Sequence, residues 1–317
     1  MENAPLVTVV ITTYNQEHTI ARAIDSVLAQ KTDFPFEIYI SEDCGSDGTR
    51  ALLLRYAARW PHLIRLNLRQ RNVGISRNWY EALCAAKGDY VCTLEGDDWW
   101  IDDHKLQKQV DFLKAHPDCF AVSHTIQLTD NAGVTYGCLP DSPLVVGRYA
   151  TMEHFLQGLT YSCTACLVKN FFDINDKKTY QYVTANRSIA DFALCMLYLD
   201  KGPVYVMDEA LSAYRVSSPT QTHQNYNTTQ SDTKKYADFL DVVAQSRNYF
   251  GDKYDFNTCL LSGTFFPFLD RIHMGGMAAF LKQMRRLPPA VKLRFPFYTA
   301  RRTFGLLTAR IKRSMHR

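Results

Sequence analysis

The feature that most constrains the fold is a regular alternation of apolar runs and helical patterns over the first 120 residues. Residues 6–12, LVTVVIT, form a continuous β-branched run, which is typical of a strand buried on both faces. Three further apolar runs follow, at 36–41, 63–68 and 90–94, and a helical pattern comes after each. Strands that alternate with helices through short loops predict an α/β fold with a mostly parallel sheet covered on both faces.

Polar residues gather where each predicted strand ends. They are Thr12, Thr13 and Tyr14 after the first strand, Glu42 and Asp43 after the second, Arg71, Asn72 and Gly74 after the third, and Glu95, Asp97 and Asp98 after the fourth. Asn15 is the predicted N-cap of the first helix. The carboxyl ends of parallel strands meet at one edge, where ligands bind in such sheets. The sequence therefore predicts one ligand site at this edge.

The stretch CTLEGDDWW, residues 92–100, crowds carboxylates that repel one another behind a buried strand. The chain has no GxGxxG after its first strand and no GxxxxGK[ST], so it lacks the glycine-rich phosphate cradles. A bound diphosphate would then need a divalent cation held by carboxylates. We therefore interpret Asp97 and Asp98 as Mg²⁺ or Mn²⁺ ligands, and Asp102 and Asp103 as caps of the next helix.

Four segments, in order and spacing, resemble successive blocks of the family 2 glycosyltransferases. They are VVITTYNQEHTIARAIDSVLAQ, IYISEDCGSDGTR, NVGISRNWYEALCAAKGDYVCTLEGDDWW and KLQKQVDFLKAHPD. The resemblance implies the GT-A fold, a Rossmann-like, mostly parallel sheet flanked by helices. It also implies inverting sugar transfer from a nucleotide-diphosphate donor such as a UDP-sugar, assisted by Mg²⁺ or Mn²⁺. The acceptor would be a hydroxyl of a glycan or lipid-linked molecule in polysaccharide and cell-envelope synthesis.

The resemblance also implies roles for individual residues at the donor side. By position, Thr12 and Tyr14 would line the nucleoside pocket, Asp43 would bond the nucleobase, Asn72 and Arg77 would approach the donor, and Asp97 and Asp98 would hold the metal and the ribose. Glu95 stands where an aspartate is common, with a glycine between. Because a glutamate is one methylene longer, we expect it to support the metal site rather than to bind the metal directly.

A second essential group is the base that takes the proton of the acceptor hydroxyl. The segment SIADFALCMLYLDKG, residues 188–202, resembles the family helix that carries this carboxylate, and Asp191 is the matching residue. Ser188 is its predicted N-cap. Without the resemblance, a first-turn aspartate that favours the helix dipole would be the better interpretation of Asp191.

The segment YRVSS, residues 214–218, resembles the stretch that closes over the donor phosphates, so Arg215 is expected to pair with them. The chain is expected to leave the sheet after PVYVM. Family members often have a histidine two residues after this arginine, but Ser217 stands here and His223 comes later, so a histidine metal ligand is in doubt. The side chains of Trp99, Trp100 and His124 either face the acceptor or pack in the core.

The C-terminal segment is strongly basic. Residues 271–317 contain twelve Lys and Arg and no Asp or Glu, whereas the rest of the chain has 36 − 12 = 24 basic against 32 acidic residues. Apolar residues follow a helical spacing, at Met277, Phe280, Leu281, Met284 and Leu287 and again at Phe304, Leu307 and Ile311. Basic amphipathic helices indicate an anionic membrane surface, and packing on the acidic body is the alternative. No organised nucleic-acid motif is present, so no nucleic-acid partner is expected.

We predict a GT-A domain over residues 1–222, with a nucleotide-sugar half at 1–120 and an acceptor half at 121–222, and a basic helical region at 223–317. No leader pattern or bilayer-spanning run is evident, and nine scattered cysteines indicate reduced thiols. These features favour a cytoplasmic protein peripheral to the inner face of the cell membrane. The alternatives are a metal-dependent nucleotidyltransferase, whose glycine-rich entry loop is absent, and a non-catalytic sugar- or membrane-binding module.

Overall fold

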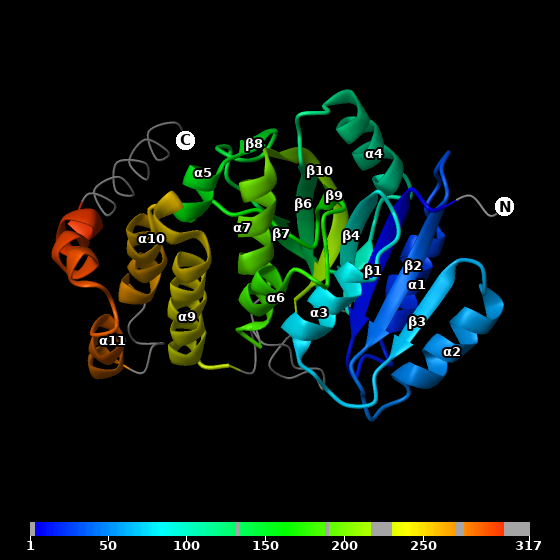
Figure 1. The fold of residues 1–317 in the computed structure, drawn as a ribbon, viewed down its shortest axis with the longest axis horizontal. Coiled ribbons are helices and arrows are strands. Elements are labelled where there is room, and N and C mark those ends of the chain that lie inside the picture. Colours follow the sequence, from blue (N-terminus) through cyan, green and yellow to red (C-terminus); the bar gives the residue numbers. More distant parts are fainter. Residues whose placement is uncertain (1–3, 131–132, 188–189, 217–229, 270–275, 301–317) are drawn as a thin grey trace. The chain divides into compact units, whose positions relative to one another are not determined.

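The computed structural model describes residues 4–130, 133–187, 190–216, 230–269 and 276–300, and its chain forms two compact units (Figure 1). Unit 1 holds the chain up to residue 155 and residues 159–229. Unit 2 holds residues 156–158 and everything from residue 230 onward.

Unit 1 is built on a mixed sheet that has ten strands in the described residues (Figure 1). Their order is β3-β2-β1-β4-β9-β6-β10-β5, with β7 beside β6 and β8 beside β10. The bounds are β1 (Val7–Thr13), β2 (Phe36–Glu42), β3 (Ile64–Leu68), β4 (Tyr90–Glu95), β5 (Trp99–Trp100), β6 (Ala121–Thr129), β7 (Thr135–Leu139), β8 (Arg148–Ala150), β9 (Leu167–Lys169) and β10 (Val204–Arg215). Strands β1 to β4 run parallel, and β9 is antiparallel to both β4 and β6. This confirms the predicted mostly parallel sheet.

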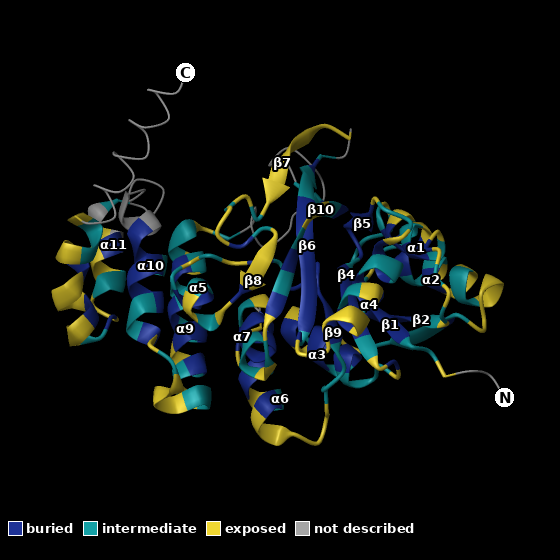
Figure 2. Cartoon of the chain, turned by 90° about the horizontal axis from the view of Figure 1, so that it is seen from above, coloured by how far each residue is buried: buried dark blue, intermediate teal, exposed yellow. Residues whose placement is uncertain are grey.

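Helices flank the sheet of unit 1. They are α1 (Ile20–Leu28), α2 (Thr49–Arg59), α3 (Ile75–Cys84), α4 (Lys105–Ala115), α5 (Met152–Leu156), α6 (Lys177–Thr184) and α7 (Asp191–Lys201). The apolar faces of α1, α2 and α4 form the main core with the first strands, as at Ile24, Leu53 and Val110 (Figure 2). Helix α3 packs on α6 through the edge-to-face rings of Tyr80 and Tyr180, whose centroids are 6.0 Å apart. This frame holds the loops at the carboxyl edge.

Two expectations about local structure were wrong, and a third lies outside the described residues. Helix α1 begins five residues after Asn15, whose φ of 52° belongs to a loop rather than to an N-cap. The chain does not leave the sheet after Met207, because register shifts on either side of Ala210 let β10 continue beside β6 as far as Arg215. The predicted cap Ser188 is not described, and α7 begins at Asp191.

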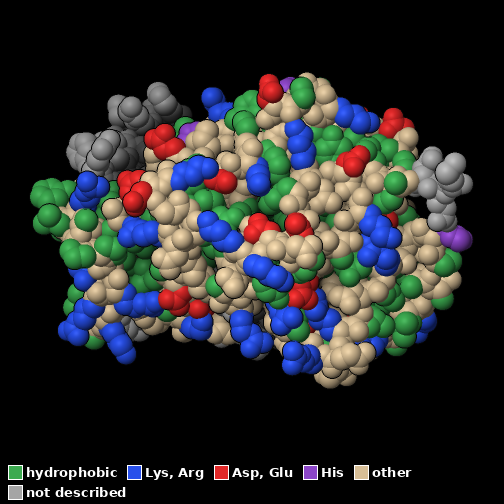
Figure 3. All heavy atoms as spheres, viewed as in Figure 1, with side chains coloured by type: hydrophobic (Ala, Val, Ile, Leu, Met, Phe, Trp, Pro, Cys, Tyr) green, Lys and Arg blue, Asp and Glu red, His purple; other side chains and the backbone are tan. Residues whose placement is uncertain are grey.

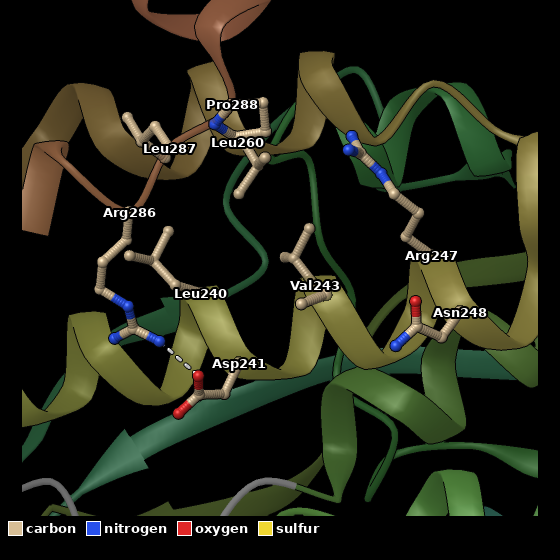
Figure 4. A pocket seen from close by; sticks show the side chains of 10 residues that line it. Leu240, Asp241, Val243, Arg247, Asn248, Leu260, Arg286, Leu287 and Pro288 are labelled. Atoms are coloured by element: carbon tan, nitrogen blue, oxygen red, sulfur yellow. Dashed lines mark hydrogen bonds and ion pairs between the residues drawn. The ribbon is translucent and has the colours of Figure 1, made fainter.

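Unit 2 is helical, with α9 (Asp232–Phe250), the short 3₁₀ helix η1 (Gly251–Lys253), α10 (Phe256–Leu269), α11 (Met277–Met284) and a further helical stretch at 289–300. The hydroxyls of Tyr236 on α9 and Thr264 on α10 are hydrogen-bonded at 2.7 Å. A cavity of about 200 Å³ lies among α9, α10 and residues 286–288 (Figure 4). In the part of the chain that the structure describes, no helix is both long and apolar enough to cross a membrane.

Candidate active site

The loops that follow β1 and β2 are joined into one frame. The backbone N–H of Ser46 donates to Asn15 Oδ1 at 2.8 Å, and that of Glu17 donates to Asp47 Oδ2 at 3.0 Å. The positive φ of Asn15 therefore orients its side-chain amide oxygen toward the neighbouring loop. Of the predicted nucleoside contacts at the end of β1, Thr12 is buried and Tyr14 is 49% exposed.

Asp43 links the ends of β2 and β3. Its carboxylate accepts hydrogen bonds from the backbone N–H groups of Val73, at 2.8 Å, and Gly74, at 3.0 Å. The Asn72 side chain donates to the Asp43 carbonyl at 3.1 Å. Burial raises the pKa of Asp43, while the two backbone hydrogen bonds oppose this rise. The structure thus brings Asp43 and Asn72 together, whereas Arg77 is occupied on α3 by Glu81, with Nε 2.7 Å from Oε1.

The acidic turn, residues 95–98, follows β4 and lies against the end of β1. The backbone N–H of Gly96 donates to the Thr12 carbonyl at 2.9 Å. A Cβ at Gly96 would collide with the Gln16 amide oxygen and lie only 3.0 Å from Ile20 Cδ1. The residue between the acidic side chains is therefore a glycine because the loop after β1 occupies the space of a side chain.

Arg215, the last residue of β10, holds the acidic turn from the other side. Its Nη2 lies 2.8 Å from Asp97 Oδ2, and its backbone N–H donates to Asp98 Oδ1 at 2.9 Å. The pairing of β5 with Ser212 and Ala213 of β10 keeps these segments together. All three residues are buried. Arg215 Nε and Nη1 are also buried and have no hydrogen-bond partner among the described residues, so they are donors available to an anion.

Four carboxylates lie in this region, and the pKa is raised for three of them, Glu95, Asp98 and Asp191. Burial, followed by repulsion from Asp97 and Glu95, raises the pKa of Asp98 well above its usual range. Burial, followed by repulsion from Asp97 and Asp191, raises the pKa of Glu95 to about 8. Burial also raises the pKa of Asp191, although its side chain remains accessible to solvent.

The residues of the acidic turn suit a hard divalent cation. Mg²⁺ and Mn²⁺ prefer oxygen ligands, and Mg²⁺ commonly takes one or two protein carboxylates together with phosphate oxygens and water. Asp97 and Asp98 supply two carboxylates whose repulsion a cation would relieve. No group of three or more His, Cys, Asp or Glu side chains suited to a metal occurs among the described residues. Asp97 and Asp98 therefore suit a cation whose remaining ligands come from a bound diphosphate and water.

The aromatic candidates are packed inside unit 1. The guanidinium of Arg22 lies 3.4 Å from the ring centroid of Trp99, and Trp100 belongs to the main core. His124 is fully buried, with Nδ1 donating to the Thr125 carbonyl at 2.7 Å. Burial and the nearby Lys105 hold its pKa well below the usual range. Core packing accounts for these three positions, and their contact with an acceptor stays a prediction.

The sequence analysis did not single out Lys105, a fully buried lysine behind the acidic turn. Its Nζ donates to Gln109 Oε1 at 2.6 Å and lies 4.3 Å from the ring centroid of Trp100. Gln109 in turn donates to the carbonyls of Val122 and Ala165. The four-residue spacing of Lys105 and Gln109 beside the buried Leu106 is the signal that could have found this pair. Ser217 and His223, by contrast, lie outside the described residues.

A sheet with an acidic turn at its carboxyl edge, clamped by an arginine from a neighbouring strand, defines a protein of the GT-A glycosyltransferase fold. The model of the family "Glycosyl transferase family 2" matches residues 8–146, and the chain carries a domain of this family.

Two bacterial proteins illustrate the relatives of this chain. An uncharacterised protein of Mycobacterium tuberculosis is 31% identical over 233 residues, which is 72% of this chain and 62% of the relative. The chain thus spans less than two thirds of that relative. EpsE of Bacillus subtilis, which carries a provisional glycosyltransferase name, is 29% identical over 69% of this chain and 76% of its own.

Two solved structures have the same fold. S. aureus TarS 1–349 in complex with UDP has a TM-score of 0.54 and 18% identity, over 85% of this chain and 72% of that one. The mannosyltransferase PcManGT from Pyrobaculum calidifontis, in complex with GDP-Man and Mn²⁺, has a TM-score of 0.52 and 14% identity, over 94% and 85% of the two chains.

Proposed function

We propose that the protein is an inverting glycosyltransferase that moves a sugar from a nucleotide-diphosphate donor, a UDP-sugar first among the candidates, to an acceptor hydroxyl. The observation that carries the proposal is the clamp of Arg215 on Asp97 and Asp98. It places two unpaired guanidinium nitrogens beside carboxylates that repel one another, at the edge where GT-A proteins bind their donors. Both similar structures were solved with a nucleotide or nucleotide-sugar.

At the donor side, two backbone N–H groups hold the Asp43 carboxylate in a fixed orientation, and its remaining lone pairs would accept a hydrogen bond from a nucleobase. Thr12 and Tyr14 would contact the nucleoside, with Asn72 and Arg77 nearby. Arg215 would donate Nε and Nη1 to the diphosphate. Asp97 and Asp98 would hold Mg²⁺ or Mn²⁺, which, when bound, would neutralise the diphosphate and favour its departure.

At the acceptor side, Asp191 would take the proton. The acceptor oxygen forms a bond to the anomeric carbon, the bond from that carbon to the diphosphate oxygen breaks, and the hydroxyl proton passes to the Asp191 carboxylate. The raised pKa of Asp191 makes it a better proton acceptor than an ordinary aspartate. Its Oδ1 accepts a hydrogen bond from the Phe192 backbone N–H at 2.8 Å, which orients the carboxylate at the start of α7.

The acceptor we propose is a glycan or a lipid-linked molecule of polysaccharide or cell-envelope synthesis, reached from the cytoplasmic face of the membrane. The segment 271–317, which has no acidic residue, would attach the protein to an anionic membrane.

A donor panel tests the proposal. The full chain is incubated with UDP-, GDP- and dTDP-sugars with and without Mn²⁺, and nucleotide release and thermal shift are measured. One donor class is expected to raise the melting temperature and to be turned over only with the cation. The Asp191→Asn variant serves as the control that binds the donor without turnover. No response to any nucleotide would overturn the proposal.

A further inference from the structure

The apolar face predicted for α11 is used inside unit 2. Phe280 on α11 and Leu287 in the turn after it are each only 2% exposed, whereas Leu281 on α11 is 51% exposed. Of the two interpretations of this face, membrane contact and packing on protein, Phe280 and Leu287 follow the second, because they pack in the core of the unit. A lipid-binding surface in this unit has to be sought elsewhere.

The turn after α11 determines which face of the next helix points inward. Figure 4 shows Leu287 and Pro288 beside Leu260, and Arg286 reaching Asp241 on α9, with which it forms an ion pair. Anchored in this way, the helical stretch 289–300 turns Val291 and Phe295 into the unit, where they are 0% and 6% exposed.

The opposite face of this stretch carries two large apolar side chains in water. Leu293 is 74% exposed and Phe297 is 77% exposed, more than any other large hydrophobic side chain among the described residues. They are four residues apart, so they lie on one face of the helix in successive turns. Figure 3 shows hydrophobic and basic side chains together at the left edge, where α11 and the following helix lie in Figure 1.

The charge around this pair has one sign. Residues 276–300 contain five Lys and Arg and no Asp or Glu. Arg286 is paired with Asp241, and the other four, which are Lys282, Arg285, Lys292 and Arg294, are exposed and have no acidic partner among the described residues. Exposed apolar side chains on a segment whose charges are all positive match the surface of an anionic bilayer, where hydrocarbon lies beneath negatively charged headgroups.

Other occupants fit less well. A second copy of the chain would bring the same cations against these, and two side chains cover far less than the roughly 1,200 Å² that a stable interface buries. The segment 301–317 contains six Lys and Arg and no acidic residue, so it would add positive charge to positive charge.

We propose that unit 2 binds the surface of an anionic lipid bilayer by inserting Leu293 and Phe297 below the headgroups, while Lys292 and Arg294 contact headgroup phosphates. This inference rests on the membrane partner of the proposed function and not on sugar transfer itself. The proposed contact surface is the outer face of residues 289–300, and not the apolar face of α11.

Vesicle co-sedimentation of the full chain tests the proposal. The protein is expected to sediment with vesicles of phosphatidylglycerol and phosphatidylcholine, to release at high salt, and to ignore pure phosphatidylcholine. The double variant Leu293→Ser/Phe297→Ser is expected to lose at least about tenfold in apparent affinity. Because both side chains are exposed, the variant should fold, which its melting curve will show. Leu54→Ser, at a 52% exposed position on α2, is the matched control and should bind like the wild type.

Three results would overturn the proposal. They are unchanged binding of the double variant, equal or absent binding of the wild type to anionic and neutral vesicles, and a wild-type dimer that the double variant dissolves in light scattering. Nucleotide release from the donor in vesicle-free solution is measured in parallel. Because the double variant lies outside the proposed donor site, its release should match the wild type, so a failure of membrane binding can be told from a failure of transfer.

Discussion

Two neighbouring acidic loops at the carboxyl edge of the sheet behave in opposite ways. After β2, every carboxylate has partners: Glu42 accepts from Arg50 and Gly45, Asp43 from Val73 and Gly74, and Asp47 from Glu17 and Thr49. After β4, the Arg215 guanidinium pairs with Asp97 and its backbone N–H donates to Asp98, whereas burial and mutual repulsion raise the pKa of Asp98 and Glu95.

This difference distinguishes carboxylates that stabilise the fold from carboxylates that are suited to bind a ligand. A buried carboxylate with a full set of donors stabilises the loop that carries it. Buried carboxylates that lack counter-charge cost stability, and they are retained where a bound cation or proton transfer uses them. Substitutions in the acidic turn are therefore expected to lower function, and substitutions of Glu42 or Asp47 are expected to lower stability. Asp43, which is also proposed to contact the nucleobase, is expected to affect both.

The largest effect is expected at the base. Asp191→Asn should lower transfer at least about 10³-fold, because the acceptor proton has no carboxylate to receive it, while the nucleotide Kd stays within about twofold. In the wild type, kcat should fall as the pH drops through the raised pKa of Asp191, since protonation removes the base. Rate and nucleotide binding are measured against pH. Transfer that survives the substitution, or an acid limb at an ordinary aspartate pKa, would contradict the assignment.

A slightly smaller effect is expected in the acidic turn. Asp98→Asn should lower transfer about 10²- to 10³-fold through loss of cation-assisted charge stabilisation. In the absence of a cation, the same variant should be as stable as the wild type or more stable, because a repelled and buried charge is gone. Urea denaturation with and without Mn²⁺ checks both halves. A variant that is active and no longer stabilised by Mn²⁺ would show that the cation does not serve transfer.

Two isosteric substitutions, one in each loop, test most directly whether the loops differ in their contribution to stability. Glu42→Gln should lower the free energy of unfolding by about 2–3 kcal/mol, since a fully buried carboxylate bonded to Arg50 and Gly45 loses its charge. Glu95→Gln should leave it unchanged or raise it, because Glu95 is repelled by its neighbours. Both are measured by urea denaturation without metal. Equal destabilisation by the two substitutions would erase the distinction between the loops.

The smallest effect is expected for Arg77→Ala. The pair of Arg77 and Glu81 lies on one helix and is partly exposed, so its loss should cost less than about 0.5 kcal/mol of stability. If Arg77 also approaches the donor, the nucleotide Kd should weaken about fivefold, which is about 1 kcal/mol. Isothermal titration with UDP separates the two roles. An unchanged Kd would show that Arg77 pairs with Glu81 on its helix and does not contact the donor.

Strong periodic patterns explain why the first half of the fold could be predicted. The runs 6–12, 36–41 and 90–94 are apolar enough to indicate buried strands, and the run 63–68 alternates apolar and polar residues like a half-buried strand. They correspond to β1 through β4. The continuation of β10 could not be predicted, because the register shifts around Ala210 depend on its pairing with β6. The burial of Phe280 and Leu287 depends likewise on tertiary packing, since an amphipathic pattern does not say whether protein or lipid covers its apolar face.

The sequence could predict which strand ends come together but not how deeply each side chain is buried. Strand ends placed Asp43 and Asn72 together and brought Asp97 and Asp98 to the same edge. The roles of these residues remain predictions. Sequence carries no direct sign of depth, so it could not show that His124 is wholly enclosed. It also could not show that Arg215 reaches the acidic turn, because 117 residues of chain separate it from Asp98.

The tight fit around Gly96 has a consequence for how this sequence can change over time. Because the Gln16 amide oxygen lies where a side chain at position 96 would begin, a substitution at either site is expected to change what the other tolerates. An alanine at 96 should be tolerated better when residue 16 is smaller, for example after Gln16→Ala, although Thr13 Cβ and Ile20 Cδ1 would still lie only 3.0 Å away. Substitutions in the loop after β1 and in the acidic turn therefore constrain one another, and the order in which they occur decides which of them are tolerated.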